Sequence, residues 1–105
     1  MSDLMKIRAR LKDGVTEVKI LMSHPMETGR RKDDLGAVVP AHFIQLVTAT
    51  LNGKTVLEAQ WGTGVSKNPY LTFRIRGARV GDKVAVTWHD NKGVSNSIET
   101  AVEAA

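Results

Sequence analysis

The sequence predicts an all-β, immunoglobulin-like antiparallel β-sandwich of about seven strands. Apolar and polar residues alternate with a period of two in several short segments. Turn sequences rich in Gly, Asn and Asp separate most of these segments, and no segment has the period of a helix. A length of 105 residues suits one domain, so residues 1–105 are predicted to form a single sandwich domain.

The first two strands are predicted as a hairpin. Residues 6–12 alternate between apolar residues and Lys or Arg, which indicates a half-buried strand with a basic outer face. Asp13-Gly14 is a strong two-residue turn signal, and residues 15–22 return with Val18, Ile20 and Met22 inward. The basic stripe could bind a ligand, or it could only discourage edge-to-edge aggregation.

A third predicted strand, residues 41–51, is apolar on both faces. Its predicted phase puts Phe43, Val47 and Leu51 on one face and Ile44 and Leu46 on the other. Both faces would then need cover, from a second sheet and from a loop or a partner chain. Without a partner, the chain could hide the second face in a homodimer.

The remaining strands follow at turn signals. Asn52-Gly53 is a second hairpin turn, and residues 54–61 return from it. Further alternation predicts strands over residues 70–76, 83–89 and 95–102, with Trp88 pointing inward. The two alanines at the end are expected to fray.

The stretch from Ser23 to Ile44 organises the chain. Its middle follows neither a strand nor a helix period, which is unusual for so long a connection in a small domain. Pro25 and Pro40 fix backbone torsions near its two ends. We interpret it as a structured loop that presents a surface; the alternative is a floppy connection between two strands.

Composition limits the chemistry of the chain. It has no Cys, which excludes a disulfide, a thiolate metal site and a thiol nucleophile. The net charge of +4 is spread along the chain, with only two Phe, two Trp and one Tyr. An acidic partner or an anionic substrate fits this pattern better than nucleic acid. No segment is apolar enough to span a membrane, and the start lacks the apolar stretch of a secretory signal.

Three histidines raise the question of a metal site. His24 and His42 flank the long loop and could approach each other, and His89 ends a predicted strand. A periplasmic metal-binding sandwich using His24, His42 or His89 is therefore an alternative function. No two of these residues have a short ligand spacing, so hydrogen-bonded loop histidines are the competing interpretation. No catalytic constellation is recognisable, and the residues favour a non-enzymatic binding module without a cofactor.

Several sequence blocks are distinctive when they are taken together. They are His24-Pro25-Met26-Glu27-Thr28-Gly29, Pro40-Ala41-His42-Phe43-Ile44, Trp61-Gly62, Ser66-Lys67-Asn68-Pro69-Tyr70, and Trp88 with Asp90-Asn91-Lys92-Gly93. In this order, and over nearly the whole chain, the blocks resemble the SoxZ family, subunits of the sulfur-oxidising (Sox) carrier complex.

This resemblance implies a function as a partner subunit. SoxZ-like chains are non-catalytic sandwiches that form a heterodimer with SoxY, whose C-terminal Cys carries sulfur intermediates during thiosulfate oxidation. Other Sox enzymes would meet the chain transiently through that complex. A signal on SoxY would take the pair to the periplasm. The residues expected at the partner interface lie in and beside the long loop: His24, Met26, Glu27, Thr28, His42, Phe43, Asn68 and Tyr70.

Overall fold

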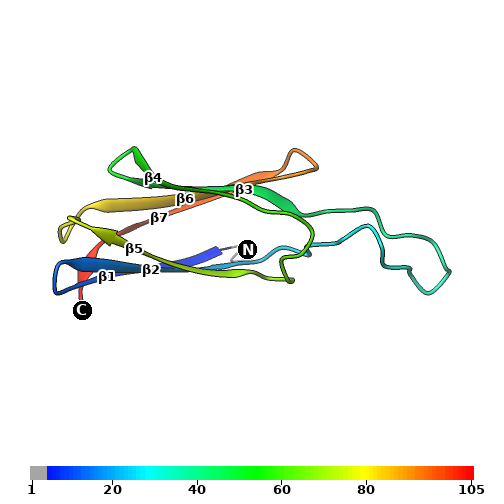
Figure 1. Cartoon of the computed structure of the whole chain (residues 1–105), viewed down its shortest axis with the longest axis horizontal. Coiled ribbons are helices and arrows are strands. Elements are labelled where there is room, and N and C mark those ends of the chain that lie inside the picture. The colour runs from blue at the N-terminus through cyan, green and yellow to red at the C-terminus, as the bar shows by residue number, and fades with distance from the viewer. Residues whose placement is uncertain (1–4) are drawn as a thin grey trace.

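The computed structural model describes residues 5–105 and contains two four-stranded sheets packed face to face (Figure 1). The predicted all-β sandwich is confirmed. The strands are β1 (Met5–Lys12), β2 (Val15–Met22), β3 (Ile44–Leu51), β4 (Lys54–Gln60), β5 (Tyr70–Arg76), β6 (Lys83–Asp90), β7 (Ser95–Ala101) and β8 (Glu103–Ala104). Among the described residues, no helix is long and apolar enough to cross a membrane.

The first sheet has the strand order β5-β2-β1-β8. β1 and β2 form the predicted hairpin, with Lys12 paired to Val15 across the two-residue turn. Asp13 and Gly14 have φ angles of 53° and 78°, the left-handed backbone that such a turn requires. The inward residues Val18, Ile20 and Met22 are fully buried, as the alternation predicts.

The second sheet has the order β4-β3-β6-β7 and carries one correction to the predicted phase. β3 begins at Ile44, three residues later than expected, and its register against β6 shifts between Ile44 and Leu46. This bulge turns Ile44 into the core, where it is fully buried beside the inward Val47. The outer face of β3 therefore carries Leu46 together with Thr48 and Thr50, and Ile44 is absent from it. The strand lacks the second apolar face on which the expectation of a homodimer was based. Homodimerisation itself stays a prediction.

A second correction concerns the end of the chain. Instead of fraying, Glu103 and Ala104 form β8, which pairs in parallel with Arg10 and Leu11 of β1. The N–H group of Ala105 donates to the carbonyl oxygen of Leu11 at 2.9 Å. Val102, just before β8, is buried, and this anchors the crossing from the second sheet to the first.

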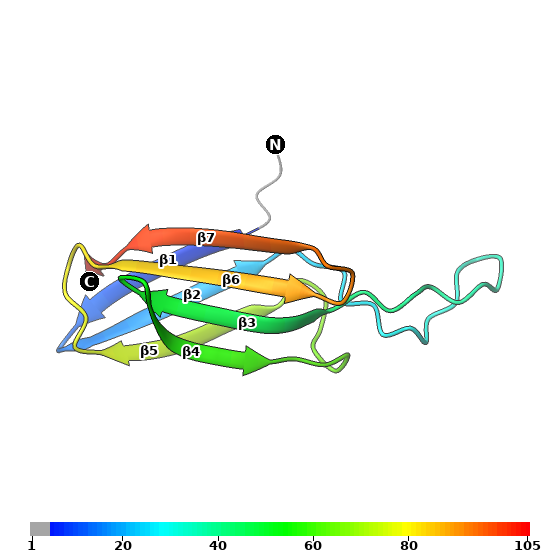
Figure 2. The ribbon, with the colours of Figure 1, turned by 90° about the horizontal axis from the view of Figure 1, so that it is seen from above.

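The loop between β2 and β3 leaves the sandwich as a narrow arm, residues 23–43 (Figure 2). With this arm, the molecule measures 53 × 23 × 22 Å. The arm emerges where β2 ends and β3 begins, so the β1–β2 turn lies at the opposite end of the sandwich (Figure 1). The core of the sandwich, including Trp88 at 3% exposure, ends close to the base of the arm.

Candidate functional site

One buried carboxylate joins both ends of the arm to the sandwich. Asp90, the last residue of β6, has its side chain completely buried. Its Oδ2 atom lies 3.1 Å from Nε2 of His24, at the start of the arm, and 2.7 Å from Nε2 of His42, at the end. Its Oδ1 atom accepts hydrogen bonds from the N–H groups of Lys92 and Val94, each at 2.9 Å. We call His24, His42 and Asp90 the arm clamp.

The neighbours of His24 determine where its proton lies. The N–H group of Met26 donates to Nδ1 of His24 at 3.1 Å, so this nitrogen needs a free lone pair. The proton of the neutral imidazole then lies on Nε2, which donates to Asp90. The ring is buried and contacts the ring of Trp88 edge-on, with centroids 5.1 Å apart. His24 is thus a fully paired core residue.

Met26 is the second anchor at the base of the arm. Its φ angle is 48°, a conformation uncommon for a residue with a side chain. The side chain is 5% exposed, and its sulfur accepts a hydrogen bond from the N–H group of Ile44 at 3.3 Å. Met26 therefore ties the outgoing strand of the arm to the first residue of β3.

The arm clamp keeps Asp90 ionised at low pH. Burial raises the pKa of this carboxyl, but the hydrogen bonds from His24, Val94, His42 and Lys92 together lower the pKa to about 2. Four donors on two oxygens leave the carboxylate well paired. Such pairing is the condition under which a buried charge is tolerated.

The arm clamp also brings together the donor set of a metal site. One ligand atom from each of its three residues lies within 4.8 Å of the others. His89 does not join them, because it is exposed on the opposite face of β6 from Asp90. A metal on Nε2 of His24 would have to displace the proton there while Nδ1 still accepts from Met26. The geometry therefore favours an arm clamp in which both histidines are hydrogen-bonded to Asp90 over one in which the three residues bind a metal ion.

Beyond the arm clamp, the arm is ordered by its own hydrogen bonds. Glu27 and His42 exchange backbone hydrogen bonds at 2.7 and 3.0 Å, and Lys32 pairs with Val38 nearer the tip. The guanidinium of Arg31 makes two hydrogen bonds to the carboxylate of Glu27, at 2.7 and 3.1 Å. The hydrogen bond from Arg31 is the largest influence on Glu27 and lowers the pKa of its carboxyl. These contacts support the interpretation of a structured loop.

The tip of the arm presents apolar side chains to solvent. Oδ1 of Asp33 accepts from the N–H groups of Leu35 and Ala37, and this closes the turn. Leu35 is 94% exposed and Val38 is 56% exposed. A tight turn thus holds an exposed leucine in the arm, and the arm is the part of the chain that extends farthest from the sandwich (Figure 1).

The structure gives the predicted interface residues different positions. His24 and Met26 are buried within this chain and can act on a partner only by fixing the arm. Asn68 is held against His24 by two hydrogen bonds, from its own N–H and to its Oδ1 atom. Tyr70 is 60% exposed, as an interface residue should be. The remaining predicted residues, Glu27, Thr28, His42 and Phe43, are partly or fully accessible along the arm. Their interface role stays a prediction.

Sequence reasoning missed two residues that organise this site. Asp90 is absent from the predicted site residues, whereas in the structure its carboxylate binds both ends of the arm. Asn91 also reaches the arm, because its Oδ1 accepts from the N–H group of Phe43 at 2.8 Å and its Nδ2 donates to the carbonyl oxygen of Ala41 at 2.9 Å. The available signal was an Asp-Asn pair at the end of a strand of alternating apolar and polar residues, in a chain with two histidines in its long loop.

Comparison with solved structures shows the same fold in another protein. A variant of superoxide reductase (neelaredoxin) from Archaeoglobus fulgidus, in the reduced form, is 18% identical with a TM-score of 0.66; the match covers 96% of this chain and 93% of that one. A second structure of this reductase, also in the reduced form, has a TM-score of 0.61 at 18% identity, over 92% of this chain and 85% of that one. At this identity the likeness shows the fold alone.

Comparison at the level of sequence families agrees with the quoted blocks. No curated protein sequence matches the chain significantly. The family model described as "Sulphur oxidation protein SoxZ" matches residues 5–101, which is nearly the whole chain and includes the arm and the arm clamp. The chain belongs to the SoxZ family of sulfur-oxidation proteins.

Proposed function

We propose that this chain is a non-catalytic subunit of a sulfur-carrier complex. It pairs with a SoxY-like chain whose C-terminal Cys carries covalently bound sulfur intermediates during thiosulfate oxidation. Family membership and the absence of any Cys support this role, because a chain without a thiol cannot itself hold a sulfur intermediate through a sulfur–sulfur bond to cysteine. The complex works in the periplasm, to which a signal on the partner brings both chains.

The observation that carries the pairing is the ordered arm. An exposed apolar tip on a mobile loop would lose much of its binding energy to ordering. Here, Asp33 fixes the tip and the arm clamp fixes the base, so that cost is met largely during folding of this chain. Leu35 can then enter an apolar pocket of the partner, with Val38 beside it.

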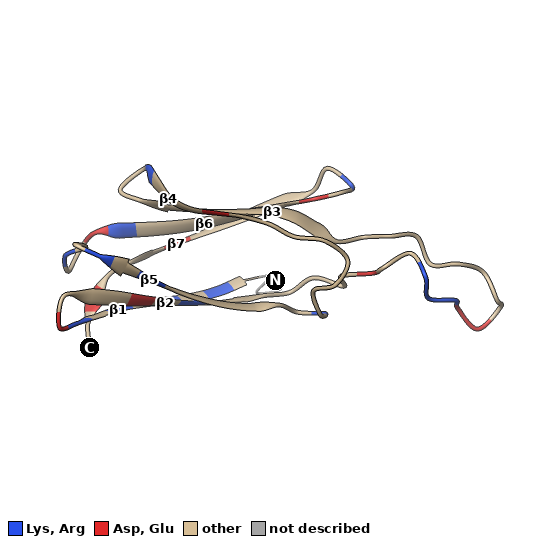
Figure 3. Ribbon diagram, viewed as in Figure 1, with Lys and Arg blue, Asp and Glu red and all other residues tan. Residues whose placement is uncertain are grey.

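Charge on the arm adds a preference for one kind of pocket. Arg30, Arg31 and Lys32 precede the tip on its outgoing strand, as the blue segment of the arm shows (Figure 3). Arg31 is already paired to Glu27, whereas Arg30 and Lys32 are exposed. A partner pocket for Leu35 with carboxylates on its rim fits this arrangement best.

Co-expression with the SoxY-like chain tests the proposal. The two chains should co-purify as a stable heterodimer, and Leu35→Asp should weaken the pair by about tenfold or more, as expected for an interface anchor. Val80→Asp is the matched control. Val80 is also apolar and 60% exposed, but it lies in the turn between β5 and β6 at the end of the sandwich away from the arm. Failure to co-purify, or equal losses from both changes, would contradict pairing through the arm.

An activity assay tests the non-catalytic role separately. The purified chain should leave thiosulfate unchanged when incubated alone with an electron acceptor. Its addition to the SoxY-like partner and the remaining Sox enzymes should restore turnover that the partner alone does not support. Turnover of thiosulfate by the isolated chain would show that it is an enzyme.

A further inference from the structure

The outer face of the sheet that contains β1, β2 and β5 concentrates the positive charge of the molecule. Seven cations point outward from these strands; Glu17 on β2, Asp13 in the β1–β2 turn and Glu103 on β8, which pairs with Arg10, oppose them, so the face carries a formal charge of +4. The whole chain carries +4. We call this surface the basic face; its cations are Lys6, Arg8, Arg10, Lys12, Lys19, Arg74 and Arg76.

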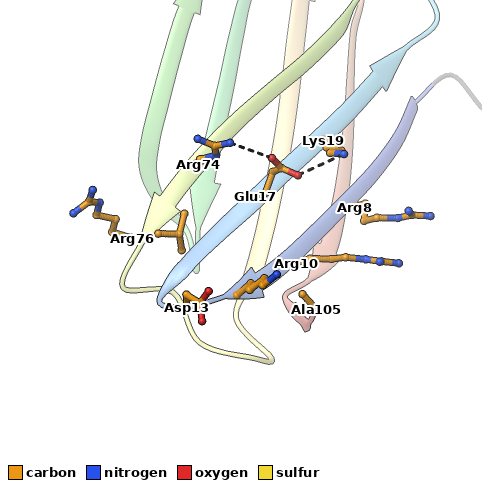
Figure 4. Close-up of a pocket in the computed structure, with 10 residues that line it drawn as sticks. Arg8, Arg10, Asp13, Glu17, Lys19, Arg74, Arg76 and Ala105 are labelled. Atoms are coloured by element: carbon orange, nitrogen blue, oxygen red, sulfur yellow. Dashed lines mark ion pairs between the residues drawn. The ribbon is translucent and has the colours of Figure 1, made fainter.

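The strand register places one pair of like charges side by side on the basic face. Arg8 lies opposite Lys19 on the neighbouring strand, and directly opposed like charges weaken a strand pair. Glu17 is the one carboxylate inside the grid, and it contacts both Lys19 at 3.5 Å and Arg74 at 3.6 Å (Figure 4). Glu17 also lies opposite Arg10 in the register, and the side chains of Arg8 and Arg10 extend outward from β1, as Figure 4 shows. Cations still outnumber carboxylates on the face, and a negatively charged partner would balance this excess and the repulsion between Arg8 and Lys19.

Protection of a sheet edge does not account for this charge. Edge protection needs charges along the outermost strand. The basic face instead extends across three adjacent strands, and β2 lies between β1 and β5. The cations therefore cover a surface and do not follow an edge.

We propose that the basic face is a docking surface for an acidic face of a partner protein. A small oxyanion would need donors that converge at one point in a sheltered pocket. The basic face lines a hollow of about 750 Å³, but this hollow is broad and open, and its side chains are exposed, with Lys19 at 49% and Arg74 at 72%. Nucleic acid is a poorer fit because Tyr70, at one corner, is the only aromatic residue among the outward residues of these strands. Leu21, Thr72 and Val15 lie among the cations and give the mixed surface usual in protein interfaces.

The size of the basic face predicts the kind of complex it forms. Four rows of outward residues on three strands cover roughly 20 by 10 Å of backbone, before side chains are added. This is below the roughly 800 Å² that each partner buries in a stable complex, so the contact is of the transient class. Association through such a face should be fast and strongly dependent on salt. Docking here needs only this charge and geometry, and it does not rest on pairing through the arm.

Nuclear magnetic resonance titration with defined anions tests the proposal. The probes are a decaglutamate peptide, a short DNA duplex of matching total charge, and sodium thiosulfate. Decaglutamate should shift backbone amides in β1, β2 and β5 only, and binding should be lost by roughly 300 mM salt, where charges are screened within a few ångströms. Tighter binding of the duplex, or saturation of the same shifts by thiosulfate, would overturn the assignment to a protein partner.

Two triple variants with the same change in charge separate the basic face from general electrostatics. Arg8→Gln, Arg10→Gln and Arg74→Gln together should weaken decaglutamate binding by about tenfold or more. The control carries Lys54→Gln, Lys67→Gln and Lys92→Gln, three exposed cations outside the face, and should bind within about twofold of the unmodified chain. Equal losses of affinity in both variants would mean that binding depends only on the net charge of the protein, and this would refute the proposal.

The stability of the face variant gives a further readout. The change removes the repulsion between Arg8 and Lys19 and also the exposed ion pair between Arg74 and Glu17, two small effects of opposite sign. The variant should therefore melt at nearly the same temperature as the unmodified chain, while its binding falls. If it does not fold, Lys12→Gln with Arg76→Gln probes the other end of the same face. Undiminished decaglutamate binding by that folded double variant would also count against the docking surface.

Discussion

His24 and Asp90 are 66 positions apart in the chain, yet Nε2 of His24 donates to Oδ2 of Asp90 at 3.1 Å inside the protein. The same oxygen accepts from His42, so a single carboxylate fixes the first and last segments of the arm. Loss of Asp90 should therefore affect the arm and the adjacent β6–β7 turn together.

Asp90→Ala should lower the free energy of unfolding by about 3 kcal/mol or more, because each buried donor that loses its acceptor costs about 1–3 kcal/mol. The change leaves four hydrogen-bond donors without their acceptor. Denaturant melts measure the loss. Asp34→Ala, which removes an exposed carboxylate from the arm, is the control and should be nearly neutral. A change at Asp90 no larger than that at Asp34 would show that the arm clamp does not stabilise the fold.

Stability should depend on acid through the same carboxyl. The folded pKa of Asp90 is about 2, below its ordinary value of 3.8, so folding binds fewer protons at this group than the unfolded chain does. The stabilisation is fully present above about pH 4 and is lost as the pH falls through 2, a total on the order of 2 kcal/mol. Melts across this range measure it, and Asp90→Asn should flatten the dependence. An unchanged slope in that variant would assign the acid sensitivity to other groups.

Metal titration separates a hydrogen-bonded arm clamp from a metal centre. Because both nitrogens of His24 are engaged in hydrogen bonds, calorimetric titration with divalent zinc or copper should show no tight stoichiometric binding that depends on His24 and His42. His89→Ala serves as the control for weak surface binding, since His89 is exposed. Tight binding that disappears with His42→Ala, and not with His89→Ala, would establish the metal-binding alternative.

Asp33→Ala should loosen the tip of the arm while leaving the sandwich intact. It removes the acceptor for the N–H groups of Leu35 and Ala37. A lost hydrogen bond of about 1 kcal/mol should accelerate amide exchange at these positions by about fivefold. Amides of β2 and β6 should exchange as before, which provides an internal control. Unchanged exchange at Leu35 would mean that the tip is held by contacts other than this turn.

The sequence predicts the strands well because alternation and turn signals depend only on residues that are close together in the chain. Alternation and turn chemistry place both two-residue hairpins, at Asp13-Gly14 and Asn52-Gly53, and the positive φ angles at these residues confirm them. The bulge at the start of β3 escapes such reasoning, because one extra residue reverses the side of Ile44 without altering the composition. β8 escapes it too, since two residues are too few to show a period.

The site was only half predictable for a related reason. The sequence indicates that His24 and His42 could approach each other, because they flank one loop, and in the structure the ring centroids are 4.6 Å apart. Nothing local links either residue to Asp90, which reaches them through the pairing of β3 with β6. Charge has the same limitation. Alternation along β1 predicts a basic stripe, but only the register of three strands reveals a basic face.

The elongated shape of the molecule has a consequence for assembly. The tip of the arm and the far rows of the basic face lie toward opposite ends of a body 53 Å long. Two proteins held at these places would be separated by the sandwich, so neither needs to leave before the other arrives. A protein bound transiently at the basic face would then be held close to the protein bound at the arm, as if the two were joined by a linker. The increase in their encounter rate would come from effective concentration, without any direct interface between the two bound proteins.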